Sequence, residues 1–304
     1  MSGELFYWLF SMSIVASVTG LVIMLIRRIR RIPRRVVAVL WVIPFLRMWL
    51  PIGFGSEYSL MSLISRFATR TVVVYQYGED KSFSMINSVM AASDYFPITY
   101  KVNVLEDVFK ICSYIWLAGA GVLLAVLFVV YAASVYDVKK SVRLRENIYL
   151  SDKIPSPAVY GILRPKIILP ASYRESESQY ILMHEKAHIR RADNLKRIIA
   201  LVTVCLHWFN PFAWLFLKCY LSDLELACDE KVLSVCSEEQ KKDYALSLIS
   251  CTESKSIFAS AFGGAKIRTR IENIVSYKKM TWLSAVGFTA LIAAAAYILL
   301  TNAA

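Results

Sequence analysis

The chain has 304 residues, of which 57% are hydrophobic and 19% are charged, and its mean hydropathy is +0.49. This composition is too apolar for an ordinary soluble domain and indicates a membrane protein with a soluble part. The formal net charge is +12, but no helix-turn-helix or RNA-binding motif accompanies it. We therefore expect no direct nucleic-acid binding and interpret the basic residues as a record of membrane orientation.

The first 52 residues predict two transmembrane helices. Residues 5–26 carry no charge and are long enough to cross the hydrocarbon core, and a second apolar run covers about 36–52. Six arginines lie between them, in the loop 27–35. A signal peptide would carry its charges before the apolar run, so this loop is expected in the cytoplasm and the N-terminus outside it.

The rest of the chain divides into four segments. Residues 53–109 are polar and are expected to form an extracytoplasmic loop, which either senses or docks a ligand or caps the helix bundle. Further spans are predicted over 110–133 and 281–300, which places the C-terminus outside as well. The segment 134–280 is therefore cytoplasmic and long enough for one domain core. None of the six cysteines lies in 53–109, a distribution that favours reduced thiols over disulfides.

The cytoplasmic segment is expected to open with charged, helix-like residues to about Arg145. Two strands, Val159–Leu163 and Lys166–Leu169, are then predicted around an Arg-Pro turn. Prolines at both ends favour an edge strand, which in a peptidase can hold a substrate backbone by strand addition. A plain structural hairpin is the alternative. The candidate substrate-binding residues of this edge are Val159, Tyr160 and Gly161.

A five-residue pattern, His184-Glu185-x-x-His188, contains two of the three histidines in the chain. Residues four apart lie on one face of a helix, so both imidazoles can bind one zinc ion while Glu185 faces the metal-bound water. The pattern is the signature of a zinc-dependent peptidase. It therefore predicts Zn²⁺ as cofactor and Glu185 as catalytic base, with a solvated helix face as the alternative.

A peptidase zinc needs a third protein ligand and one open position. Glu225 is the first choice, because it lies downstream on a helix-like run. Three other residues stay open as the third ligand: Asp229, Glu230 and His207. Asp229 shares a helix face with Glu225, and both Asp229 and Asp193 are candidates for carboxylates that orient the ligand imidazoles.

An apolar run over residues 198–217 could be taken as another membrane span. If it crossed the membrane once, His184 and Glu225 would emerge on opposite sides and could not share a metal. Asn210-Pro211 divides the run into two pieces, each too short to cross. We therefore predict a helical hairpin that packs on the bundle or enters the inner leaflet and returns.

Together these motifs resemble the BlaR/MecR-type membrane zinc metallopeptidases, the signal transducers of bacterial beta-lactam resistance and their relatives. Three ordered motifs carry the resemblance: Leu182-Met-His-Glu-x-x-His188-Ile-x-Arg191-x-Asp193, His207-Trp-Phe-Asn-Pro211-x-x-Trp214 and Asp223-x-Glu225-x-x-Cys228-Asp229-Glu230. It implies a mainly α membrane protein with four transmembrane helices and a cytosolic gluzincin-like α+β zinc metallopeptidase domain between the third and fourth. It also implies His184, His188 and Glu225 as zinc ligands.

The resemblance further implies a signal-transducing endopeptidase in the bacterial plasma membrane. Its expected partners are the lipid bilayer and a cytosolic winged-helix repressor as substrate, and a homodimer is left open. The family's self-cleavage suggests a cut near Ala261–Phe262. The beta-lactam transducers continue into an extracellular penicillin-binding sensor, whereas this chain ends four residues after Leu300. It therefore resembles a short member or a shortened form, and direct beta-lactam binding is not expected.

Two other functions stay open. A quality-control or processing zinc peptidase of the membrane would share the histidine pair and the Glu225–Asp229 pair. The His-Trp-Phe-Asn-Pro block favours the regulatory peptidase over it. A non-enzymatic membrane receptor or scaffold with structural zinc is the third reading, and it predicts that Glu185→Ala leaves signalling intact.

Overall fold

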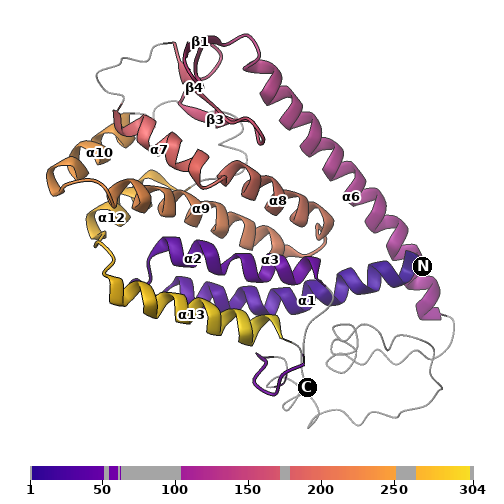
Figure 1. Ribbon diagram of the computed structural model, residues 1–304. Helices are drawn as coiled ribbons and strands as arrows, with labels where there is room; N and C mark the ends of the chain where they lie inside the picture. The colour runs from indigo at the N-terminus through magenta and orange to yellow at the C-terminus, as the bar shows by residue number, and fades with distance from the viewer. Residues whose placement is uncertain are drawn as a thin grey trace.

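The computed structural model describes residues 2–50, 55–60, 62, 104–171, 179–250 and 265–301. Most of the predicted extracytoplasmic loop, and both residues of the predicted cleavage bond near Ala261–Phe262, lie outside these ranges. The described part is mostly helical, with one four-stranded sheet at one end (Figure 1).

Three helices in the described part are long and apolar enough to cross a membrane: α1 (Ser2–Arg27), α6 (Val104–Asp137) and α13 (Trp282–Leu300). Each contains an 18-residue apolar window with at most two charged residues, so the backbone can satisfy its own hydrogen bonds while the side chains of that window face hydrocarbon. Helices α6 and α13 expose most of their apolar surface, as lipid-facing helices do. The described residues thus contain three of the four predicted spans.

The single helix predicted over 36–52 is not present in the structure. Two short helices occupy this region, α2 (Arg34–Leu40) and α3 (Val42–Trp49). Pro44 has no N–H to donate to the carbonyl of Leu40, so helical hydrogen bonding is interrupted where α2 ends. The pair of helices is shorter than a hydrocarbon core of about 30 Å requires.

Arg47 on α3 ties this pair of helices to the end of α13. Its guanidinium is buried and donates to the backbone carbonyl of Leu300 at 2.8 Å and to that of Thr301 at 3.2 Å. The last carbonyls of a helix have no partner inside the helix, and a cation there also interacts favourably with the helix dipole. The arginine thus closes the C-terminus of α13.

The sheet has the order β1-β2-β4-β3, with β2 and β4 parallel and the other pairs antiparallel. Its strands are β1 (Val142–Arg145), β2 (Ile148–Ser151), β3 (Ala158–Tyr160) and β4 (Lys166–Pro170). Two strands therefore flank the Arg-Pro turn as predicted, but the first, β3, ends at Tyr160 rather than Leu163, and it is an edge strand. The helix-like reading up to Arg145 is wrong, because Val-Arg-Leu-Arg alternates apolar and charged residues with the period of a strand and pairs with β2.

The region that follows contains α7 (Gln179–Arg190), α8 (Asp193–Leu206) and α9 (Pro211–Leu233). The chain turns back between α8 and α9 (Figure 1). Asn210 accepts a hydrogen bond from the N–H of Phe212 at 2.9 Å and so caps α9. Its amide also donates to the hydroxyls of Ser13 and Ser17 on α1, at 2.7 and 2.8 Å. The apolar run thus forms two helices whose connecting turn is bound to α1.

Helix α9 contributes to two hydrophobic cores. One core joins it to α1, α2, α3, α8 and α13 and includes Trp41 and Phe216, both fully buried. The other joins it to α7 and to α10 (Glu238–Ser250) and α12 (Ile267–Ser276), and includes Tyr244 and Val232. In Figure 1, α9 lies between the layer of α1, α2 and α3 and the layer of α7. The membrane helices and the group of α7, α10 and α12 therefore meet at α9.

We predict that Gly119→Ala destabilises the protein by about 1–3 kcal/mol through overpacking. A Cβ at Gly119 would lie 2.7 Å from the indole ring of Trp208 in the α8–α9 turn, whereas a Cβ at Gly121 on the same helix meets nothing within 4 Å. Gly121→Ala is thus the matched control, and it should be neutral or slightly stabilising. Thermal denaturation in detergent measures both. Equal melting temperatures for the two variants would contradict the close packing of α6 against the turn.

Candidate metal centre

The two histidines of the HExxH pattern face each other on α7. Their Nε2 atoms are 3.0 Å apart, and the planes of their rings are almost perpendicular. Both side chains are buried, as is that of Glu185 between them in sequence. The spacing of four residues places the imidazoles on one helix face, so two ring nitrogens converge on one point.

Glu225 of α9 reaches the same point from the opposite helix. Its Oε2 lies 3.6 Å from Nε2 of His184 and 3.7 Å from Nε2 of His188. Ligand atoms around a tetrahedral zinc, with bonds of 2.0–2.1 Å, are about 3.3 Å apart. The other carboxylate oxygen accepts a hydrogen bond from Arg197. The spacing of these three donors is compatible with a shared metal ion.

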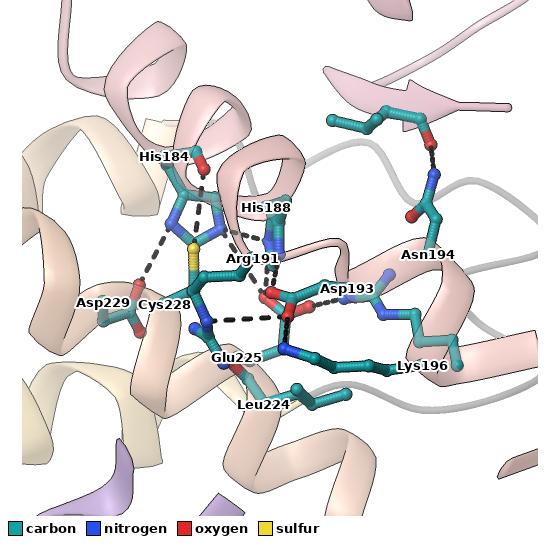
Figure 2. Close-up of polar contacts among 12 residues, drawn as sticks. His184, His188, Arg191, Asp193, Asn194, Lys196, Leu224, Glu225, Cys228 and Asp229 are labelled. Atoms are coloured by element: carbon teal, nitrogen blue, oxygen red, sulfur yellow. Dashed lines mark hydrogen bonds and ion pairs between the residues drawn. The ribbon is translucent and has the colours of Figure 1, made fainter. Parts of the chain in front are cut away.

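Cys228 also lies at this centre. Its Sγ and a ring nitrogen of each histidine are all within 4.8 Å of one another. Figure 2 shows the sulfur on α9 pointing toward α7, beside the His184 ring. The described residues therefore offer two side chains of α9, a carboxylate and a thiol, to the histidine pair.

The second nitrogen of His188 is bound by Asp193. The Nδ1–H of His188 donates to Oδ2 of Asp193 at 2.8 Å, and the carboxylate is fully buried (Figure 2). Ala192, just before Asp193, has a φ of 52°, a left-handed conformation that non-glycine residues adopt at a cost. This strained residue ends the turn after α7 and brings Asp193 back under the histidine. The contact fixes the tautomer that leaves Nε2 free for a metal.

His184 is oriented by residues that come from α9, α10 and α12. Its Nδ1 lies 2.9 Å from the hydroxyl of Tyr244, and this hydroxyl donates to Asp229 at 2.5 Å. Asp229 in turn accepts two hydrogen bonds from Arg270, at 2.6 and 2.8 Å. A guanidinium nitrogen of Arg270 is also 3.3 Å from Nε2 of His184. Three helices thus hold one imidazole in place.

Glu230 and His207, which sequence reasoning left open as third ligands, lie away from the histidine pair. The carboxylate of Glu230 accepts the backbone N–H groups of Arg34 and Arg35 at 2.8 and 3.1 Å, and so caps the start of α2. His207 is buried in the α8–α9 turn, with its Nε2 3.2 Å from the carbonyl of Met48. The structure brings neither of them to the histidine pair.

The edge strand β3 lies beside the start of α8. The side-chain amide of Asn194 donates to the carbonyl of Val159 at 2.9 Å and to that of Gly161 at 3.2 Å. These carbonyls are acceptors that an added substrate strand would use. A substrate bound at this edge would therefore compete with Asn194.

Buried charges of opposite sign shift the pKa values at the centre. Burial alone would raise the pKa of Glu225, but His188 and Arg197 lower it well below its usual range. Burial opposes protonation of His188, yet Cys228, Glu225 and Asp193 raise its pKa to about 9. The two histidines lower the pKa of Cys228 to about 7 against the effect of burial. The metal-free centre therefore holds protons at neutral pH that a metal would displace.

Sequence reasoning missed four residues of the centre: Arg197, Cys228, Tyr244 and Arg270. Cys228 could have been found, because it lies three residues after Glu225 and shares its helix face. Tyr244 and Arg270 lie 60 and 86 residues from His184, and nothing in their local sequence marks them. They reach the site because α10 and α12 pack on α7 and α9.

The comparisons with known proteins agree with one another on the family. The family model described as BlaR1 peptidase M56 matches residues 7–275. The chain is 28% identical over 152 residues to the regulatory protein BlaR1 of Bacillus licheniformis, covering 46% of this chain and 25% of that protein. It is 27% identical over 145 residues to the methicillin resistance mecR1 protein of Staphylococcus aureus, covering 44% and 25%. The similarity thus spans about a quarter of the length of these curated relatives.

We predict that the affinity for Zn²⁺ rises with pH between pH 6 and 8. The ligand imidazoles must lose their protons to bind metal, and the pKa of His188 is raised to about 9. Each pH unit below that value should change the apparent affinity up to about tenfold per displaced proton. Competition with a chromophoric chelator measures the slope. Asp193→Asn should flatten it by lowering the pKa of His188, and an affinity independent of pH would contradict the protonated metal-free centre.

Proposed function

The chain belongs to the BlaR1 peptidase M56 family, and from that premise we propose that it is a zinc-dependent endopeptidase of the membrane. The convergence of His184 and His188 with Glu225, from two helices, is the observation that carries the proposal. These residues would hold the metal. Asp193 and the Tyr244–Asp229 pair support the assignment, because they orient both imidazoles with Nε2 toward the shared point.

Glu185 is the proposed catalytic base. When bound, zinc polarises the scissile carbonyl and lowers the pKa of a water molecule. Glu185 directly follows His184 on α7, and its side chain is buried. It would accept the proton of the attacking water and deliver it to the leaving amine. Zinc peptidases with the same HExxH pattern use the glutamate for this step.

We place the active site on the cytoplasmic side. The six arginines between residues 27 and 35 mark that side by the positive-inside rule. Asp223 accepts a hydrogen bond from Arg27 at 2.7 Å, and it lies only two residues before Glu225 on α9. The metal centre therefore lies near the level of the basic loop, which supports a cytosolic substrate and extracytoplasmic termini.

The proposed role is regulatory. Relatives bear the names regulatory protein BlaR1 and methicillin resistance mecR1 protein, and membrane helices joined to a peptidase suit the relay of a signal across the membrane. The proposed substrate is a small winged-helix repressor in the cytosol. A second proposed cut lies in the chain itself, near Ala261–Phe262, between α10 and α12.

We predict that Glu225→Ala and His184→Ala each weaken zinc binding by the detergent-solubilised protein, because each change removes one of the proposed ligands. Glu185→Gln should keep the zinc and lose all peptide cleavage, because it retains the shape of the side chain and removes the base. Elemental analysis measures the zinc. Mass spectrometry of the intact chain, and of a winged-helix repressor incubated with it, measures cleavage.

Glu238→Gln is a matched surface control. Glu238 lies in the first turn of α10, where it pairs with Lys241 at 2.6 Å, and its side chain is 84% exposed. Zinc binding and peptide cleavage should therefore be unchanged. A zinc affinity of Glu225→Ala equal to that of the wild type would refute the ligand assignment. Unchanged cleavage by Glu185→Gln would refute the role of the base and favour a zinc-bound scaffold. An uncleaved, full-length wild type, as intact as Glu185→Gln, would exclude self-cleavage.

A further inference from the structure

Cys228 is a metal-binding side chain at the centre to which the proposed function gives no role. It is fully buried on α9 and lies three residues after Glu225, on the same helix face. Its Sγ is within 4.8 Å of a ring nitrogen of both His184 and His188. The two helices thus bring a thiol to the histidine pair as well as a carboxylate (Figure 2).

The thiol is not engaged by a strong partner elsewhere. Its hydrogen bond to the backbone carbonyl of His184 is 3.5 Å long, and a thiol is only a weak donor. Zinc binds thiolates at about 2.3 Å and accepts mixed sets of imidazole and thiolate ligands. Cys228 therefore has a suitable donor atom that is already directed at the place where the metal ligands converge.

We propose that Cys228 is a further protein ligand of the metal, and that it gives the centre a closed, thiolate-bound latent state. This inference rests on the proposed function, because it takes His184, His188 and Glu225 as the other ligands. Four protein ligands complete a tetrahedral zinc site of the structural kind, whereas catalytic sites have three and leave one position for water. Peptide cleavage thus requires that Cys228 leave the metal.

The charge balance of the buried centre supports a second anionic ligand. Zinc with Glu225 as its anionic ligand keeps one positive charge, and Arg197 and Arg270 add two more close by, at side-chain exposures of 32% and 16%. Asp229 is already paired with Arg270 at 2.6 Å. A net charge buried away from water is costly. A thiolate from Cys228 would neutralise the metal and its ligands and would lower the net positive charge of the centre.

The test uses the full chain in detergent, with Co²⁺ in place of zinc. A thiolate bound to Co²⁺ gives a charge-transfer band in the near ultraviolet, and the d–d bands in the visible report occupancy of the site whichever donors bind. We expect both in the wild type. Cys228→Ser and Cys228→Ala should lose the near-ultraviolet band and keep the visible bands. X-ray absorption of the zinc form should show a sulfur ligand at about 2.3 Å in the wild type and none in Cys228→Ser.

Two control variants locate the signal. Cys236 is buried and free, but it is not among the residues of the metal group, so Cys236→Ser should keep both bands. His184→Ala should weaken both, because it removes one ligand of the metal. Visible bands without the near-ultraviolet band in the wild type, or a near-ultraviolet band that persists in Cys228→Ala, would overturn the thiolate ligand and leave the proposed peptidase standing. A wild type that binds neither Co²⁺ nor zinc would overturn both.

Discussion

Helix α9 carries buried carboxylates on two faces, and the structure depends on the pairing of both. Asp223 and Glu230 face the basic loop at the end of α1, where the first is bound by Arg27 and Trp41 at 2.7 and 2.8 Å. Glu225 and Asp229 face α7 and the histidine pair. An unpaired buried carboxylate costs several kcal/mol, so α9 is stable only where arginines lie on one side and the metal centre on the other. The helix thereby joins the membrane part to the candidate active site.

This arrangement has a consequence for the relay of signals. Asp223 is two residues from Glu225, and Glu230 is next to Asp229, so a continuous hydrogen-bonded helix links each pair. A shift of α1 or α2 that moved the arginines would have to move α9, or break contacts as short as 2.7 Å. Packed interfaces of this kind change between discrete arrangements rather than deform continuously. The geometry therefore supplies a physical connection between the membrane helices and the ligands that α9 contributes.

The sequence was sufficient for the parts of the site that rest on helix periodicity. His184 and His188 had to share a face if α7 was a helix, and the need for one metal to reach both His184 and Glu225 required the apolar run between them to turn back. Arg270 was not predictable, because its contact with Asp229 depends on how α12 packs, 41 residues further along the chain. The helix predicted over 36–52 is divided into α2 and α3 for a local reason, because hydropathy counts apolar residues and takes no account of the hydrogen bond that Pro44 removes.

A peptide substrate of a zinc peptidase needs a backbone edge to lie on and a metal with a free position. In this structure Asn194 binds the edge carbonyls of Val159 and Gly161, and Cys228 lies at the metal centre. Both groups belong to helices, α8 and α9, that are joined by the turn bound to α1 through Asn210. Both groups thus lie on the α8–α9 pair, which also contributes Glu225 to the histidine pair. The proposed opening of the metal position must therefore spare Glu225, because Glu225 lies three residues from Cys228 on the same face of α9.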